Sequence, residues 1–189
     1  MDNLMPSPLW AIFAVILVIV VEMLKKEKLQ DKIRFIMFTA FFYYIFRVLT
    51  LTLFPFPITE LAKESIRHRS YEIFINLKPL FMGFQWQALK THILNIIMFI
   101  PYGLLLPMSV KKQFNLKMII RNSFMFSLLI ETLQLLISLI WIHAPYRIFD
   151  INDLFLNTLG GLIGWGIYLI ARNMIEYINI RFAQKAKIN

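Results

Sequence analysis

The sequence lacks several features that are typical of soluble and secreted proteins. None of its 189 residues is cysteine, which excludes disulfides and any metal or nucleophilic site built on a thiol. Charged residues make up only 16% of the chain, whereas about 25% is usual in soluble domains. The segment before Leu9 contains no lysine or arginine, and no small-residue cleavage site follows it, so we expect no cleaved signal peptide. The low share of charged residues and the absence of a cleavage site are as expected for a chain that stays in a membrane.

Apolar residues dominate the chain and occur in long runs. They account for 59% of it, against about 45–50% in soluble proteins. A helix needs about 20 mostly apolar residues to cross a hydrocarbon core of about 30 Å. The sequence therefore predicts an all-α fold, a single polytopic transmembrane helical bundle over residues 1–189. Its five expected spans lie at about 4–24, 33–54, 93–110, 118–142 and 154–171.

Basic residues favour one orientation of this bundle. The net charge of +9 could suggest a nucleic-acid partner, but the basic residues gather between apolar runs, as membrane topology requires, so none is predicted. Segments 25–34, 111–121 and 172–189 carry 13 lysines and arginines, whereas residues 55–90 and 143–149 carry 6. The positive-inside rule then predicts an N-terminus outside, a cytoplasmic C-terminus and an extracellular loop over 55–90.

The stretch Arg147–Gly164 places polar and small residues at the outer mouth of the last span. Asp150, Asp153 and Asn157 recur at steps of three and four, so they lie on one helix face. A lipid-facing stripe of this composition would be costly, so the face should meet other helices or a water-filled pocket. Helix capping by Asp150 explains part of the pattern equally well, but it does not explain Asn157 one turn deeper.

Two further spans carry polar residues that we expect to open toward the same side. In the fourth span, Glu131 and Gln134 share a face, and Glu131 should lie roughly 16 Å below the outer end of its helix. An acid at that depth needs a partner, and Arg47 of the second span is the candidate for structural pairing. Asn95 lies in the outer half of the third span. The sequence thus predicts a polar pocket between three helices.

The predicted ligand-binding residues of this pocket are Asn95, Glu131, Gln134, Arg147, Asp150, Asp153 and Asn157. The two aspartates could hold a cation, a cationic ligand group or a sugar, and Arg147 suits either a phosphate or a surface ion pair. Other residues should serve helix packing, through a kink or a close approach: Pro101, Gly103, Gly160, Gly161 and Gly164. No catalytic residue, resident metal or cofactor is predicted.

Four segments of the chain resemble the VanZ-like family, in order and at similar spacing. They are NLKPL (Asn76–Leu80), NIIMFIPYGLLLP (Asn95–Pro107), ETLQ (Glu131–Gln134) and FDINDLFLNTLGG (Phe149–Gly161), which together cover about residues 70–165. The resemblance implies a small, multi-pass protein of a bacterial plasma membrane. The family is named for a member that confers resistance to teicoplanin, a glycopeptide antibiotic, so a role in antibiotic resistance at the cell envelope is implied as well.

Three functional hypotheses follow. In the first, a non-enzymatic protein surrounded by membrane lipids binds an envelope lipid, a glycan precursor or the glycopeptide itself. In the second, an intramembrane enzyme acts on a lipid-linked substrate, with Glu131 as acid or base and Asp150 and Asp153 around a divalent cation. The chain contains no H-E-x-x-H motif and no nucleophile elbow, which weighs against this enzyme. The third is a small transporter or accessory subunit, although no internal repeat is present. We favour the first.

Overall fold

The computed structural model describes residues 3–4, 15, 17–19, 29–68, 73–78 and 86–188. Within these segments four helices are long and apolar enough to cross a membrane, in agreement with an all-α membrane fold. They are α2 (Leu29–Leu53), α4 (Trp86–Ser109), α5 (Leu116–Leu136) and α6 (Ile151–Ile188). The first of the five expected spans, at about 4–24, lies almost entirely outside the described residues.

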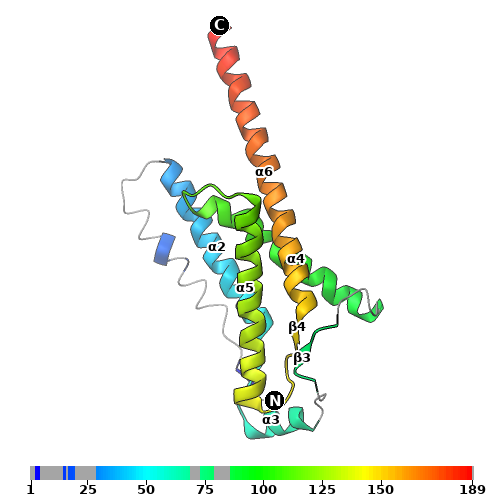
Figure 1. Cartoon of the computed structure of the whole chain (residues 1–189). Helices are drawn as coiled ribbons and strands as arrows, with labels where there is room; N and C mark the ends of the chain where they lie inside the picture. Colours follow the sequence, from blue (N-terminus) through cyan, green and yellow to red (C-terminus); the bar gives the residue numbers. More distant parts are fainter. Residues whose placement is uncertain are drawn as a thin grey trace.

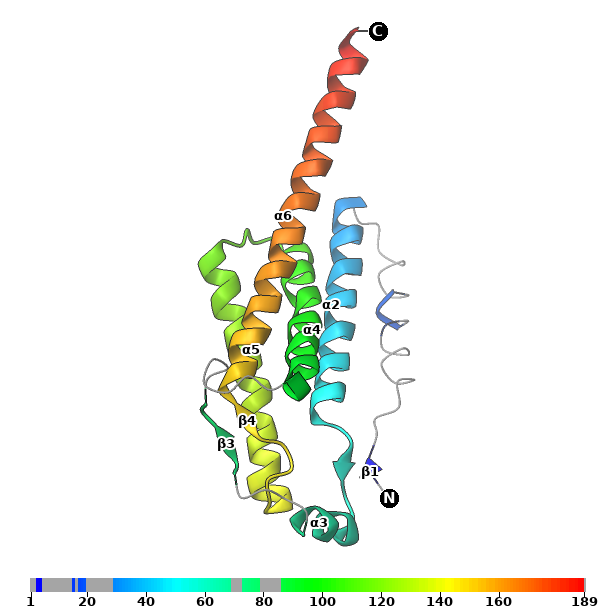
Figure 2. The same cartoon turned by 90° about the vertical axis from the view of Figure 1, so that its right-hand side faces the viewer.

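Successive long helices alternate in direction (Figures 1 and 2). One end of the bundle holds the start of α2, the end of α4 and the start of α5, and the short helix α3 (Glu60–Arg67) lies at the opposite end. The C-terminal half of α6 projects beyond the other helices, and residues 172–184 are exposed throughout. This helix is therefore much longer than the span expected at 154–171.

Glycines bring the backbones of α4 and α6 into contact. A Cβ atom at Gly164 would overlap the carbonyl oxygen of Ile100, and Gly160 faces the α4 backbone in the same way. Gly103 makes the reciprocal approach from α4, where a Cβ atom would overlap the carbonyl group of Gly161. Small residues allow such approaches between membrane helices, where packing rather than hydrophobic burial drives association. The α4–α6 pair is the most extensive helix contact of the described bundle.

Aromatic side chains fill the space between α2, α4 and α5. Phe99 is fully buried, and it packs with Val48 of α2 and Ile130 of α5. Tyr102 stacks on Phe126, with 5.1 Å between ring centroids and 9° between ring planes. Stacked aromatic pairs stabilise a core beyond the area that they bury, so these rings hold the three helices together.

The helix α5 continues into a π-helical segment, Ile137–Ile142, which the sequence did not predict. His143 ends this segment with a left-handed backbone, at φ 58°. Inside it the buried Ser138 hydroxyl accepts a hydrogen bond of 2.9 Å from the N–H of Arg147 and donates one of 2.8 Å to the carbonyl of the same residue. After the π segment the chain therefore reverses direction and runs back beside α5 toward the start of α6 (Figure 2).

Two short strand pairs hold the loops at this end of the bundle. The strand β3 (Ile75–Asn76) pairs in parallel with β4 (Phe149–Asp150), with Asn76 opposite Asp150. The strand β1 (Asn3–Leu4) pairs antiparallel with β2 (Phe56–Pro57). The first pair matters for the site because it brings residues 73–78 to the start of α6.

We predict that Gly164→Ala destabilises the bundle, because the added methyl group would overlap the carbonyl oxygen of Ile100. Overpacking typically costs about 1–3 kcal/mol, so the midpoint of thermal unfolding in detergent should fall by several degrees. The matched control is Gly166→Ala, since nothing lies within 4 Å of a Cβ atom there. The control should keep or raise the midpoint, because alanine favours helix. Equal midpoints for the two variants would contradict the close contact.

Candidate functional site

The helix α6 begins beside the middle of the α5 and π segments rather than at their far end. Glu131 is 2% exposed, and its Oε2 atom accepts a hydrogen bond of 2.9 Å from the backbone N–H of Asp150. Ile142 lies eleven positions after Glu131, which corresponds to roughly 16 Å along a helix. The start of α6 is therefore recessed from that end of the bundle (Figure 2). Asp150 was expected at the mouth of its span, and it lies instead at the level of Glu131.

The side chain of Asp150 joins three segments of the chain. Its Oδ2 atom accepts a hydrogen bond of 2.9 Å from the Asn76 side chain in β3. Its Oδ1 atom accepts from the backbone N–H and from the side-chain amide of Asn152, both at 2.8 Å. The backbone bond is a helix cap. Asn152 also donates to the carbonyl of Lys78 at 2.9 Å, so residues 76–78 are bound to the start of α6.

Two further polar pairs occupy the next turns of α6. The Oδ1 atom of Asp153 accepts a hydrogen bond of 2.5 Å from the Asn95 side chain of α4. One turn deeper, the amide of Asn157 donates to the Ser127 hydroxyl of α5 at 2.8 Å. Asn157 is 2% exposed, and in the described part of the chain its Oδ1 atom has no hydrogen-bond partner. The polar stripe of α6 thus meets α4 through Asp153 and α5 through Asn157.

Gln134 and Arg147 are engaged elsewhere. The Gln134 amide donates to the carbonyl of Thr52 at 2.9 Å, and the Arg147 guanidinium donates through Nη2 to the carbonyl of Phe54 at 3.4 Å. Both contacts fix the C-terminal end of α2, one to α5 and the other to the segment before β4. The Nε atom of Arg147 is buried without a hydrogen-bond partner among the described residues. Five of the seven predicted binding residues therefore meet around the start of α6, and two secure the neighbouring end of α2.

We refer to the residues around the start of α6 as the acidic cluster: Asn76, Asn95, Glu131, Asp150, Asn152, Asp153 and Asn157. The ion pairs within the described segments engage other acids, and none engages Glu131, Asp150 or Asp153. Arg47 was expected to pair with Glu131, and the N–H of Asp150 takes that place. A backbone donor satisfies the carboxylate without bringing a second charge into the bundle.

The arrangement determines which chemical groups the acidic cluster can bind. Ionised carboxylates only accept hydrogen bonds, and they do so most strongly from charged donors and from hydroxyl groups. Three carboxylates gather here, and each already holds one or more amide donors. In the residues that the structure describes, no group of three or more histidine, aspartate or glutamate side chains could hold a metal ion. A ligand that donates hydrogen bonds suits this cluster chemically.

Two members of the acidic cluster, Asn76 and Asn152, are not among the binding residues that the sequence predicts. Asn152 is only 6% exposed, but it lies off the helical stripe that contains Asp150 and Asp153. Asn152 belongs to the cluster because it binds the segment 73–78, which the β3–β4 pair brings to the start of α6. A usable signal did exist for Asn76, because it opens NLKPL, the first of the four segments that carry the family resemblance.

We predict that Glu131→Gln leaves the stability of the fold nearly unchanged and that Glu131→Ala lowers it. The glutamine side chain still offers an oxygen to the N–H of Asp150, whereas alanine leaves this donor buried without an acceptor. An unsatisfied buried donor costs about 1–3 kcal/mol. Thermal unfolding in detergent should therefore show a midpoint several degrees lower for the alanine variant and nearly unchanged for glutamine. Equal losses in both variants would contradict the role of this hydrogen bond.

Comparison with known proteins places the chain in a family. The family model described as VanZ/LLP1 matches residues 35–172, which is more than half of the chain. The match is wider than the range of about 70–165 that the four segments suggested, and it contains the whole acidic cluster. No curated protein and no solved structure matches the chain. Four helices among the described residues are long and apolar enough to cross a membrane, and with this match the chain is a multi-pass membrane protein that belongs to the VanZ/LLP1 family.

Proposed function

We propose that the acidic cluster faces outward in a bacterial plasma membrane and binds an envelope lipid, a glycan precursor or a glycopeptide antibiotic. Binding there would change how the cell surface accumulates glycopeptides and would contribute to resistance of the teicoplanin type. The protein acts in this proposal as a binding protein without a covalent step. The proposal rests on the geometry of the cluster and on membership of the VanZ/LLP1 family.

One observation carries this proposal. The four segments that resemble the family lie far apart in the sequence, yet each contributes a side chain to the acidic cluster. Asn76, Asn95 and Glu131 come from three of them. Asp150 and Asp153, both from the fourth segment, accept hydrogen bonds from Asn76 and Asn95, and the backbone N–H of Asp150 donates one to Glu131. Hydrogen-bonded polar pairs also serve helix packing in membranes, but a shared binding site explains in addition why polar residues of all four family segments meet at one place.

The chemistry of the acidic cluster favours a ligand rich in hydroxyl or ammonium groups. Such groups donate hydrogen bonds to carboxylates, and the buried Oδ1 atom of Asn157 offers another acceptor. Sugars and cationic antibiotics both carry donors of this kind. Arg147 donates through Nη2 to the carbonyl of Phe54, and its Nε atom, which has no hydrogen-bond partner among the described residues, would complement the phosphate of a lipid-linked glycan. These features together favour a glycan-bearing envelope molecule over an ordinary phospholipid.

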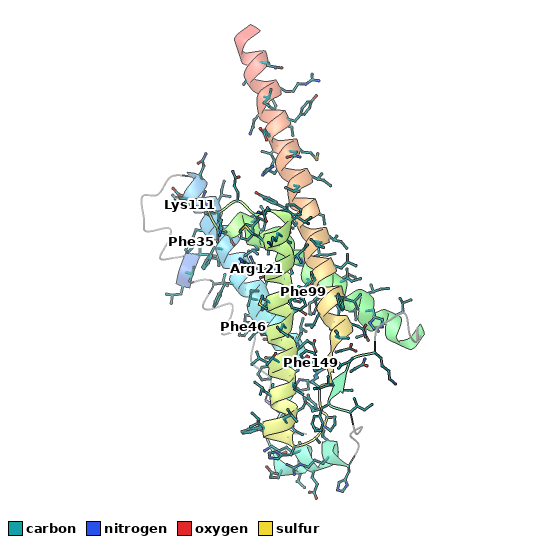
Figure 3. All side chains as sticks on the ribbon, viewed as in Figure 1. Phe35, Phe46, Phe99, Lys111, Arg121 and Phe149 are labelled. Carbon is teal, nitrogen blue, oxygen red and sulfur yellow. The ribbon has the colours of Figure 1, made fainter. Side chains whose placement is uncertain are left out.

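The distribution of basic residues supports the outward orientation. Lys111 lies at one end of the bundle, whereas Phe149, which precedes Asp150, lies toward the other (Figure 3). Lys112, Lys117 and Arg121 lie in or after the same α4–α5 loop as Lys111. The positive-inside rule assigns such a loop to the cytoplasm, and the start of α6 then lies on the outer side.

We predict that the protein raises teicoplanin resistance when it is expressed in a susceptible Gram-positive host. Glu131→Gln should abolish this gain, and so should the double change Asp150→Asn with Asp153→Asn, because each replaces a carboxyl oxygen, which can accept a ligand's hydrogen bond, with an amide NH2 group, which only donates. The measurement is the minimum inhibitory concentration relative to empty vector, with membrane levels compared by immunoblot. The native protein should raise this concentration several-fold.

The matched control for this experiment is Glu176→Gln, which makes the same acid-to-amide change at an exposed position of α6 far along the helix from the acidic cluster. It should leave the inhibitory concentration at the native level. Native resistance that persists in the cluster variants at equal expression would refute the binding site. Absence of resistance with the native protein would refute the teicoplanin role.

A further inference from the structure

A groove of about 320 Å³ lies at the end of the bundle opposite to the acidic cluster. It is open to the surface and is formed by α2, by the end of α4 with the loop that follows, and by α6. Its apolar wall includes Ile33, Met37, Met108 and Tyr168. The wall is therefore suited to hold a hydrocarbon chain.

Three basic side chains line the same groove: Arg34 of α2 with Lys111 and Lys112 of the loop after α4. Asp31 pairs with Arg34 at 2.9 Å and with Lys111 at 3.3 Å. Lys112 forms no ion pair with any residue that the structure describes. These four side chains together leave an excess of two positive charges, so the groove attracts an anion.

The ends of the apolar spans place this groove at a membrane surface. The span in α2 begins at Gln30, and the span in α4 ends at Ser109. Arg34 and Lys111 lie within a few residues of these limits, and Figure 3 shows Lys111 at this end of the bundle. Tyr168 adds an aromatic ring of the kind that is enriched at the membrane–water interface. The groove thus combines an apolar wall and a cationic rim where lipid headgroups lie.

We propose that this groove binds one anionic phospholipid. Its phosphate lies between Arg34, Lys111 and Lys112, and an acyl chain lies along Met37 and Met108. The excess of positive charge selects an anionic over a zwitterionic headgroup, because basic clusters beside membrane spans attract anionic lipids. The apolar wall selects a lipid over a small soluble anion. This site lies apart from the acidic cluster and does not depend on the function proposed for it.

The test measures lipid binding to the full-length, delipidated protein in detergent by native mass spectrometry. Phosphatidylglycerol and phosphatidylcholine serve as probes. The variant Lys111→Gln with Lys112→Gln removes two charges from the groove. Its matched control, Lys117→Gln with Arg121→Gln, removes two charges from exposed positions of α5 that do not line the groove. Phosphatidylglycerol affinity should fall roughly tenfold or more in the groove variant and stay nearly native in the control.

A second variant tests the apolar wall without a change of charge. Met37→Trp should fill the groove and weaken phosphatidylglycerol binding, whereas Met125→Trp, at a position that is 51% exposed on α5, should not. If the double groove variant fails to fold, as judged by thermal unfolding, Lys112→Gln and Met37→Trp carry the test. Equal affinity of the native protein for both lipids would overturn the proposal. Equal losses in variant and control, or displacement of the lipid by glycerol phosphate alone, would also overturn it.

Discussion

The hydrogen bond from the backbone N–H of Asp150 to the carboxylate of Glu131 fixes where the last helix begins. Since α6 begins at this level, Asp153 comes opposite Asn95, and Asn157 reaches α5 one turn further on. An acid inside a membrane bundle is costly unless its hydrogen bonds are satisfied. The backbone donor meets this requirement and leaves the carboxylates of the cluster without a cationic partner among the described residues.

The close contact of α4 with α6 keeps this arrangement in register. Gly160 and Gly164 let the α6 backbone meet the α4 backbone, and a shift by one residue would bring Ile163 or Trp165 to the place of Gly164. The bundle thus carries two chemically different sites at different places. A recessed group of carboxylates and amides lies around the start of α6, and a groove lined by three basic side chains lies where α2 begins. Both sites are built by residues from several helices, so both depend on the same packing.

Sequence alone predicts the four long helices of the described residues but not the full length of α6, and it predicts the depth of the site poorly. The span expected at 118–142 corresponds to α5 with its π segment, which ends at Ile142, because membrane thickness sets the length of an apolar run. Hydropathy does not reveal how far a loop folds back, so the recess around Asp150 was not foreseen. Opposite charge suggested Arg47 as the partner of Glu131, but the partner is a backbone N–H, which every residue except proline carries. Spacing along the sequence cannot reveal such a donor.

The central claim is that the acidic cluster faces the outside of the cell, and cysteine labelling tests it directly. The chain has no native cysteine, so single replacements report one position each. Leu77 is 64% exposed beside Asn76 of the cluster, and Gln113 is exposed in the loop between α4 and α5. In intact cells, a membrane-impermeant maleimide should label Leu77→Cys, and it should label Gln113→Cys only after the membrane is opened. The reverse pattern would place the acidic cluster in the cytoplasm and would contradict the account.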